Sequence, residues 1–446
     1  MFKADYDVLV IGGGPAGSAA AIFSRQHGLS VCVVEKETFP RFHIGESLLP
    51  HGNRIFQELG VWPLLEAAGF VHKFGAYFFL ANGAAGKEII FSEGIIPGLE
   101  RTFQVERAKF DLILLDHART LGAEVRMPAT VRTLAPGEGG HTATLQTAAG
   151  EQTVTARWVI DASGRDKFFP CEAKRAIDPS PFPKRIAIYN HFQGMARAPG
   201  RAAGHTTAVR LGDGWFWIIP LAEGRTSVGL VTTVDSMRRS GLAPAELFAR
   251  AVAHSPKLRE LMAGAEPMMD FRVTSDYSYF HRTLATERMI MAGDAGGFFD
   301  PIFSSGVYMA LHSAQLAAGL VARAHREQRT LTPRECRGYT RAVKKHAGVF
   351  QKLIAVFYDN DAFSVFLCSR APLRMDLAIT SIVAGHASLT WPVWWRFKLF
   401  LLICRLQKVL PFVPRIDFSG MAAVGDLGPE PSATAGETKD SLPVSL

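Results

Sequence analysis

Three glycines near the N-terminus have the spacing that holds a pyrophosphate. Gly12, Gly14 and Gly17 follow the apolar run Val8–Ile11 and precede an alanine-rich stretch. In a strand–turn–helix unit, the first glycine permits the tight turn, the second lets the backbone approach the phosphates, and the third lets helix and strand pack closely. A second apolar run ends at Glu35, about 20 residues after the glycine motif. An acidic residue at this distance accepts a hydrogen bond from a ribose hydroxyl of the dinucleotide. The spacing predicts a dinucleotide site rather than a purely structural glycine turn.

Two further apolar runs end in polar residues. Trp158–Asp161 is followed by Ser163 and Gly164, and Met289–Ala292 is followed by Gly293 and Asp294. In open α/β sheets, ligands bind beyond the carboxyl ends of the strands, so both ends are candidate ligand positions. An aspartate there can accept from a sugar or ribityl hydroxyl. The nearby turn at residues 304–306 precedes a helix and is a candidate anion site, although structural Gly/Ser loops have the same composition.

Some residues have a structural and a functional interpretation. Lys73 enters the aromatic stretch Phe74–Leu80, where a lysine usually lies at a strand end or extends its amine to water. Trp215 and Trp217 are two residues apart, so in a strand they share one face and can be core packing. The polar residues of the loop 38–50 suggest flavin contacts beside a nucleotide site, or an ordinary polar surface.

Composition limits the class of protein. The chain has 446 residues, 48% hydrophobic and 20% charged, which predicts a globular protein of two or three domains. Its five scattered cysteines lack metal-binding spacing and suggest a reducing cytoplasm without a metal site. The first strand begins too early for a cleaved signal peptide. The net charge of +8 favours acidic partners, but no nucleic-acid motif accompanies it.

The elements around these residues follow from hydrophobic patterning. Residues 127–157 alternate short polar strands with glycine turns, which predicts a three-stranded meander. Residues 180–275 are strand-rich with few helices, and 323–346 are basic with a helical period. Residues 391–414 are apolar but interrupted by basic residues, so they cannot span a membrane. They predict either a helix pair closing the substrate side or a membrane-surface anchor. Residues 422–446 predict disorder.

The three junctions, in this order, resemble the FAD domain of the group-A flavoprotein monooxygenase superfamily. Within it the chain resembles the flavin-dependent halogenases, especially the phenol/pyrrole-type branch, over residues 5–345. Arg41–Pro50 is similar to the family's flavin loop, and Lys73–Ala76 to the segment with its catalytic lysine. Trp215–Pro220 fits its Trp-x-Trp-x-Ile-Pro signature, and Phe298–Gly306 its halide and flavin motif.

The resemblance implies an α/β fold with a discontinuous Rossmann-like FAD-binding domain, of the GR2 or p-hydroxybenzoate-hydroxylase type. The implied divisions are the FAD domain (1–75, 100–180 and 276–345), an antiparallel β-sheet substrate domain (76–99 and 181–275), a C-terminal helical region (346–420) and a disordered tail (421–446).

The resemblance also implies roles for individual residues. Lys73 would be catalytic. The cofactor would contact Gly12, Gly14, Ala16, Gly17, Glu35, Lys36, Arg41, Ile44, Gly45, Glu46, Ser47, Arg107, Asp161, Gly293, Asp294, Pro301, Gly306 and Val307. The halide would contact Ser304, Ser305 and Gly306. The substrate-side motif would comprise Trp215, Trp217, Ile219 and Pro220, with the two tryptophans keeping substrate away from the flavin.

The chemistry implied by the family is halogenation. FAD, reduced by a separate NAD(P)H-dependent flavin reductase, would use O2 and chloride or bromide to make hypohalous acid, which Lys73 would direct to an electron-rich ring. The substrate would be a phenol, pyrrole or indole, free or bound to a carrier protein. We expect a cytoplasmic monomer or homodimer without a transmembrane segment.

Two other interpretations share this scaffold. An FAD-dependent aromatic hydroxylase or an isoprenoid-type reductase would give oxygenated or saturated products without needing Lys73. A flavoprotein that has lost catalysis would bind flavin but would not consume O2 after reduction.

Overall fold

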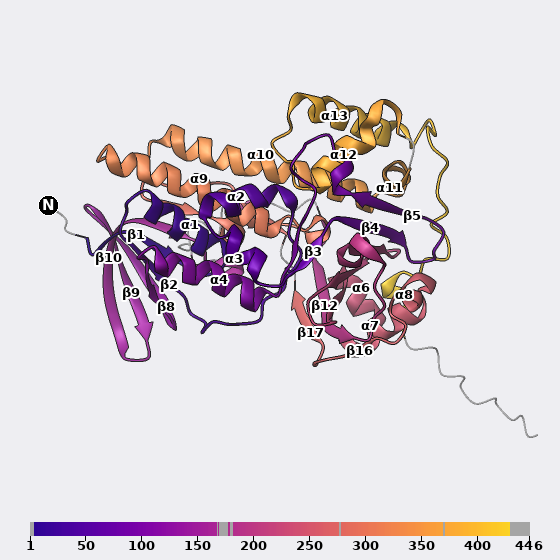
Figure 1. Cartoon of the computed structure of the whole chain (residues 1–446), viewed down its shortest axis with the longest axis horizontal. Helices are drawn as coiled ribbons and strands as arrows, with labels where there is room; N and C mark the ends of the chain where they lie inside the picture. Colours follow the sequence, from indigo (N-terminus) through magenta and orange to yellow (C-terminus); the bar gives the residue numbers. More distant parts are fainter. Residues whose placement is uncertain are drawn as a thin grey trace, which may run out of the picture.

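The computed structural model describes residues 4–166, 168, 177–178, 182–275, 278–368 and 371–428, and shows two lobes joined by long helices (Figure 1). The first lobe is built on a seven-stranded sheet of order β7-β2-β1-β10-β9-β8, with β19 also paired to β10. Its strands are β1 (Tyr6–Ile11), β2 (Val31–Val34), β7 (Glu124–Arg126), β8 (Ala129–Gly137), β9 (Gly140–Thr147), β10 (Gly150–Asp161) and β19 (Met289–Met291).

Strand β10 joins two kinds of pairing in this sheet. Its first half pairs antiparallel with β9, which confirms the predicted meander, and its second half pairs parallel with β1 and β19. Along β1, Val8 and Val10 belong to the core with the helices, whereas Leu9 and Ile11 belong to the core with the meander. This alternation follows from the two-residue period of a strand. The helices of this lobe are α1 (Pro15–Gln26), α2 (Asn53–Leu59), α3 (Trp62–Ala67), α4 (Arg107–Thr120) and α9 (Gly306–Arg326).

The second lobe has an eight-stranded sheet of order β16-β12-β15-β14-β13-β4-β5, with β17 paired to β12. Its strands are β4 (Gly75–Leu80), β5 (Gly86–Ile90), β12 (Arg185–Gln193), β13 (Thr206–Arg210), β14 (Trp215–Pro220), β15 (Thr226–Thr233), β16 (Glu266–Pro267) and β17 (Arg272–Ser275). The sheet is antiparallel as predicted except for one pair. Strands β4 and β13 run parallel, which the more than one hundred residues between them permit, since a parallel pair needs a long crossover connection.

Helices also occur where few were expected. The segment between β15 and β16 contains α6 (Val234–Ser240), α7 (Pro244–Ala253) and α8 (Pro256–Leu261). Their starts have local signals, since Thr233 and Ser255 accept N-cap hydrogen bonds and prolines occupy the first turns of α7 and α8. Two small sheets complete the strands: β3 (Val71–Lys73) with β6 (Thr102–Gln104), and β11 (Ile177–Asp178) with β18 (Tyr279–His281) and β20 (Gly297–Phe298).

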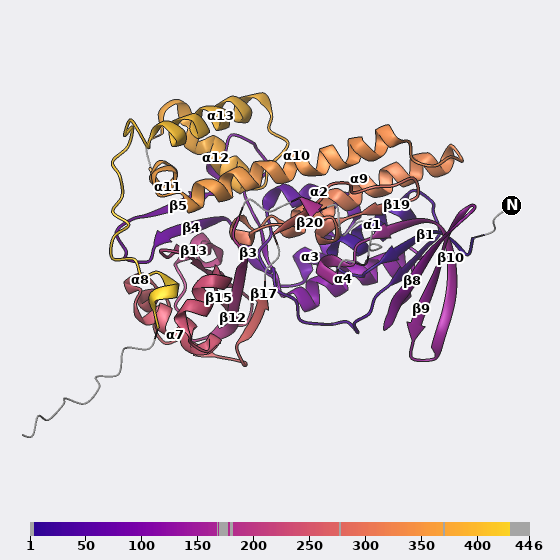
Figure 2. The same cartoon turned by 180° about the vertical axis from the view of Figure 1, so that it is seen from behind.

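The C-terminal helices cross and cap the second lobe. Helix α10 (Pro333–Tyr358) runs along both lobes in the view from behind (Figure 2). It is continuous across the expected boundary at 345/346, because the capping box of Thr332 and Glu335 starts it and it ends only where Asp359 caps the next helix. The helices α11 (Asn360–Leu367), α12 (Met375–Val383) and α13 (Trp391–Leu406) follow.

The start of the predicted disordered tail is folded. Val424 is fully buried in the core of the second lobe, and its N–H donates to Asp213 (2.6 Å). This long-range anchor extends the ordered chain beyond the predicted boundary at 421, whereas 429–446 lie outside the described residues. Within the described ranges, no helix is both long enough and apolar enough to cross a membrane.

Candidate functional site

A cavity of about 780 Å³ lies between the two large sheets. The first lobe lines it with the residues that follow β1, β2 and β10 and with the start of α9, and the second lobe lines it with β12 to β15. The predicted site residues on its wall are Gly12, Gly14, Ala16, Glu35, Lys36, Arg41, Ile44, Gly45, Glu46, Ser47, Arg107, Trp215, Trp217, Ile219, Asp294, Pro301, Ser304, Gly306 and Val307. Residues far apart in the sequence are therefore brought to one space.

Several predicted contact residues lie behind this wall. A Cβ at Gly17 would approach the Gly12 carbonyl oxygen to 1.8 Å, and a Cβ at Gly293 would approach that of Ala16 to 2.9 Å. Asp161 is fully buried and its carboxylate accepts from the Ser163 N–H (3.0 Å). Their close packing at the strand ends shapes the turns that face the cavity. Lys73, Ser305 and Pro220 are also outside the wall and buried.

The glycine turn and Glu35 form a cradle at the end of β1. Gly12 has a φ of +98°, and a Cβ there would lie 2.5 Å from the Ala162 carbonyl oxygen, so only glycine fits. The first N–H groups of α1 have no partner inside the helix, and no acid occupies its first turn. The Glu35 carboxylate accepts from the N–H groups of Gly13 (2.6 Å) and Glu37 (2.8 Å). The cradle fits a pyrophosphate with its ribose.

A buried cluster holds two arginines at the cavity wall. Asp111 is fully buried and accepts from both Nε and Nη2 of Arg107 (2.7 and 2.9 Å) and from Nη1 of Arg41 (3.0 Å). Arg107 also donates to the carbonyls of Ile44 (3.0 Å) and Gly45 (3.3 Å). Sequence reasoning missed Asp111, although its position four residues after Arg107 on a helix is a detectable signal.

Two carboxyl groups face the cavity with capacity for further hydrogen bonds. Glu46 contacts the His191 ring (2.7 Å) through Oε1, and its buried Oε2 has no hydrogen-bond partner in the described structure. Burial raises the pKa of Asp294 to about 6, with Arg165 and Arg107 opposing the shift. A large polar cofactor with several donors suits these groups better than an apolar ligand does.

Lys73 is enclosed next to this cavity. Its side chain is 2% exposed, and Nζ donates to Ser47 Oγ (2.8 Å) and to the Leu48 carbonyl (3.0 Å). Its Nζ lies 5.4 Å from the centre of the Phe91 ring, in the turn η2 (Phe91–Glu93). Burial without a carboxylate partner among the described residues lowers the pKa of Lys73 to about 7.

A chain of polar side chains connects Lys73 with the cavity. Ser47 shares a hydrogen bond with Thr206 (2.9 Å), and both residues line the cavity. Gln104 donates to Thr206 Oγ1 (2.8 Å) and to the Gly204 carbonyl (2.9 Å). The Ser47 hydroxyl therefore stands between the cavity and the amine. Its neighbours Thr206 and Gln104 were not found from the sequence, because only the folded chain brings them to Ser47.

The tryptophans of β14 lie on one face, as expected. Their ring centres are 6.0 Å apart, both rings line the cavity, and Trp217 Nε1 donates to Ser227 Oγ (3.1 Å). The alternate residues Phe216 and Ile218 belong to a separate core. The two tryptophans thus form part of the cavity wall, and a hydrogen bond orients the Trp217 ring.

A second buried acid, missed by sequence reasoning, supports the turn before α9. Asp300 hydrogen-bonds Tyr358 (2.5 Å), lies 3.3 Å from Arg185 Nε and accepts from the Ile302 N–H (3.1 Å). Burial raises the pKa of Asp300, and Arg185 opposes the shift. Its local signal is the Asp-Pro pair, which suits the start of a helical turn.

The predicted halide turn follows this acid. Ser304 adopts a left-handed conformation (φ +54°), and the helix α9 begins at Gly306, where a Cβ would meet nothing within 4 Å. Ser304 and Gly306 line the cavity, whereas Ser305 is 2% exposed and lies behind them. The turn therefore presents the open N-terminus of a long helix to the cavity, which favours an anion.

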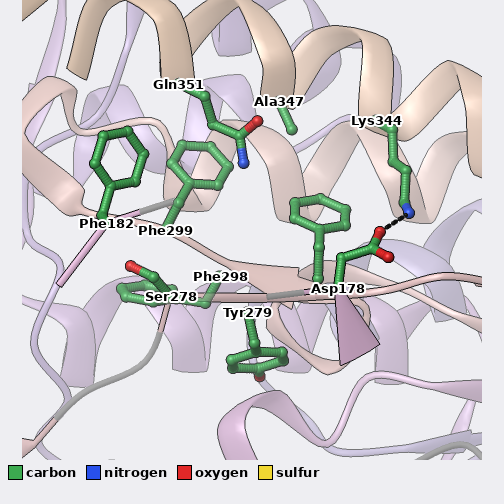
Figure 3. Close-up of a pocket in the computed structure, with 10 residues that line it drawn as sticks. Asp178, Phe182, Ser278, Tyr279, Phe298, Phe299, Lys344, Ala347 and Gln351 are labelled. Carbon is green, nitrogen blue, oxygen red and sulfur yellow. Dashed lines mark hydrogen bonds and ion pairs between the residues drawn. The ribbon is translucent and has the colours of Figure 1, made fainter. Parts of the chain in front are cut away.

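A smaller pocket of about 200 Å³ adjoins the large cavity and shares Ser278, Tyr279 and Phe298 with it. Figure 3 shows aromatic rings along it, and the Lys344 amine pointing to Asp178 (2.8 Å) at one end. The pocket therefore combines aromatic rings with polar side chains, and the ion pair brings the charges of Lys344 and Asp178 together.

Comparisons with known proteins agree on one family. A family model described as tryptophan halogenase matches residues 7–92 and 85–363. A pyrrole-2-carbonyl peptidyl-carrier-protein chlorinase of Pseudomonas fluorescens is 36% identical over 344 residues, covering 72% of this chain and 76% of its own. A brominase of the same description from Pseudoalteromonas luteoviolacea is 33% identical over 325 residues, covering 72% and 78%. The structure of the myxobacterial chondrochloren halogenase, an FAD-dependent halogenase, superposes with a TM-score of 0.74 at 28% identity, covering 89% and 97%.

Proposed function

The chain belongs to the tryptophan-halogenase family and is a flavin-dependent halogenase, and from this premise we propose that Lys73 directs hypohalous acid to an electron-rich aromatic substrate. Its cofactor is FAD, and when bound and reduced this group supplies the electrons with which O2 and halide yield the halogenating species. The remaining steps concern what the residues of this chain do.

FAD would occupy the cavity between the sheets. The Gly12–Gly14 turn and α1 would hold the pyrophosphate, and Glu35 would accept a hydrogen bond from the ribose. Arg41 and Arg107 would contact the parts of the cofactor that lie beyond the ribose. The fit is supported by the buried Glu46 oxygen that has no hydrogen-bond partner among the described residues and by the glycine-only turn at Gly12. Chloride or bromide would lie at Ser304 and Gly306, where the start of α9 favours negative charge.

The observation that carries the proposal is the placement of Lys73. Its amine is 2.8 Å from Ser47 Oγ, which lines the cavity, so a small molecule formed there meets Ser47 before the amine. A pKa of about 7 keeps both forms of the lysine available at neutral pH. The ammonium can donate a hydrogen bond to hypohalous acid. The neutral amine can instead attack its halogen, so that the O–halogen bond breaks, water leaves and a haloamine forms. Either would aim the halogen away from the flavin and toward a bound ring.

The substrate we propose is a phenol, pyrrole or indole, free or carried as an acyl group on a carrier protein. Two similar proteins are described as acting on a carrier-bound pyrrole-2-carbonyl group, which supports the carrier-bound form. Reduced flavin would come from a separate NAD(P)H-dependent reductase, because no second dinucleotide fingerprint occurs in the sequence.

Bromination of a substrate panel tests the proposal. Purified protein with FAD, a flavin reductase, NADH and bromide is given phenols, indole and pyrrole-2-carboxylate, free and loaded on a carrier protein. We expect a product with the bromine isotope doublet in its mass spectrum. An oxygenated or saturated product at the same turnover would instead assign a hydroxylase or a reductase.

Replacing Trp217 by phenylalanine tests the role of the tryptophan wall. The smaller ring also loses the hydrogen bond to Ser227, which opens space between the cavity and the substrate side. We expect oxygenated product to appear beside halogenated product, measured by mass spectrometry. A Phe216→Leu variant, which changes the opposite face of the same strand, is the control. An unchanged product ratio in Trp217→Phe would contradict the shielding role.

A further inference from the structure

The outer face of α13 and its flanking turns is apolar and exposed. We call it the α13 face, and its residues are Leu373, Trp391, Trp394, Leu402, Leu406, Val409, Leu410 and Phe412. The helix forms an outer edge of the second lobe in both views (Figures 1 and 2). Its other side packs onto α11 and α12 through residues that include Phe397 and Phe400. An apolar helix is normally covered on both sides, and no segment of the described ranges covers the α13 face.

The exposure is strongest at the two ends of α13 and in the turn η7 (Pro372–Arg374), which precedes α12. Trp391 is 70% exposed at the first residue of α13, and Val409 is 79% exposed after its end. Leu373 in η7 is 62% exposed, and its carbonyl accepts from Arg396 of α13 (2.9 Å). The rings of Trp391 and Trp394 stack on each other at 5.2 Å, outside the core. The exposed side chains come from α13 and from separate turns, so the α13 face extends beyond the helix itself.

The charged residues around the α13 face are mostly cations. Residues 377–416 contain five lysines and arginines and no aspartate or glutamate. Two of these cations pair with acids of α11 and the residue before it, Lys408 with Asp359 (2.5 Å) and Arg415 with Asp361 (3.1 Å). The exposed Lys398 and Arg405 have no ion pair among the described residues, and Lys398 lies 5.9 Å from the Trp394 ring.

The positive charge of Lys398 and Arg405 favours some binding partners of the α13 face over others. A second copy of the chain would bring a second Lys398 and Arg405 into the same interface without adding an acid from this stretch, because a two-fold interface is made of two identical surfaces. An acidic protein would need a hollow that matches the projecting side chains. A lipid surface needs no such hollow, since it deforms around them, and tryptophan with lysine or arginine is the composition of helices that lie in a membrane interface.

We propose that the α13 face docks the protein on an anionic lipid surface. The apolar side chains would enter the boundary between headgroups and acyl chains, while Lys398 and Arg405 would pair with anionic headgroups. Docking of this kind leaves the helix parallel to the surface and does not require a membrane span. The proposal concerns binding only, so it stands or falls independently of halogenation.

Flotation of the full-length protein with vesicles tests the proposal. Vesicles of phosphatidylcholine alone are compared with vesicles that also contain phosphatidylglycerol. We expect binding to the anionic vesicles, weakened by salt. The double variant Lys398→Glu/Arg405→Glu should bind at least about twentyfold more weakly, since each cation near such a surface contributes about fivefold. The double variant Trp391→Ser/Val409→Ser should also lose binding, because it removes two of the apolar side chains that would enter the lipid.

Matched variants distinguish the α13 face from the overall basic charge. Arg132→Glu/Arg238→Glu makes the same change in net charge at exposed positions on β8 and α6. Leu64→Ser removes an exposed leucine from α3. Both controls should bind anionic vesicles like the parent, and thermal unfolding should show that all variants fold.

Three results would overturn the proposal. The first is absence of flotation with anionic vesicles, including the case in which the face binds an acidic carrier protein instead. The second is equal weakening by the control charge variant, which would show non-specific attraction. The third is a dimer, detected by light scattering, that becomes a monomer in the Trp391→Ser/Val409→Ser variant. That result would assign the α13 face to contact with a second copy of the chain.

Discussion

Replacing Lys73 by alanine should lower the yield of halogenated product by about a hundredfold to ten-thousandfold, the range expected when a positioned proton-transfer group is removed. NADH and O2 consumption should continue, because Lys73 does not line the cavity that would hold FAD. The measurement is brominated product by mass spectrometry beside O2 uptake. The variant should therefore separate flavin oxidation from halogen transfer.

Lys87 provides a matched control for this experiment. Lys87 is half-buried, and its amine donates to two carbonyls (Phe366, 2.9 Å, and Cys368, 3.1 Å) and lies over an aromatic ring. Burial lowers the pKa of Lys87 as well. A Lys87→Ala variant should keep halogenation in proportion to its FAD content. If both variants lost product equally, the effect of Lys73 would be one of folding, and the directing role would be contradicted.

The same lysine predicts a dependence on pH. With its pKa lowered to about 7, Lys73 is mostly ammonium below that pH and mostly neutral amine above it. The fraction of O2 consumption that yields halogenated product should change around pH 7. A rise with pH would identify the amine as the active form, and a fall would identify the ammonium. A Lys73→Arg variant stays protonated throughout and should show no such change.

The second large effect is expected at Asp111. An Asp111→Asn variant keeps the shape of the side chain but leaves Arg41 and Arg107 without their shared carboxylate. Breaking a buried ion pair on one side typically costs about 3 to 5 kcal/mol, so the free energy of unfolding should fall by that order. Because both arginines line the cavity, FAD affinity should fall at least about tenfold. Urea unfolding and flavin titration measure the two effects.

Asp116 on the same helix is the control for this change. It pairs with Arg119 at the surface (2.5 Å), and its side chain is 52% exposed. Exposed pairs contribute about 0 to 1 kcal/mol, so Asp116→Asn should change stability little and FAD affinity not at all. An Asp111→Asn protein with the stability and affinity of Asp116→Asn would show that the cluster does not organise the cavity.

The sequence by itself determined the features that depend on neighbouring residues. The glycine spacing from Gly12 to Gly17 requires a tight turn and close helix packing, and the structure has both. The alternation along β14 put Trp215 and Trp217 on one face. The meander of 127–157 followed from its polar strands and turns. Such features are encoded locally, because steric limits and side-chain periods act over a few residues.

The tertiary structure decided everything that depends on distant partners. It placed Ser47 between Lys73 and the cavity, buried Asp161 behind the wall, and paired β4 in parallel with β13. It also left the outer face of α13 exposed while it covered the inner one. Sequence patterning gives a residue's polarity and its position along an element. Its burial, its partner and its pKa depend on which distant segments pack against it, because desolvation and charge pairing act through space rather than along the chain.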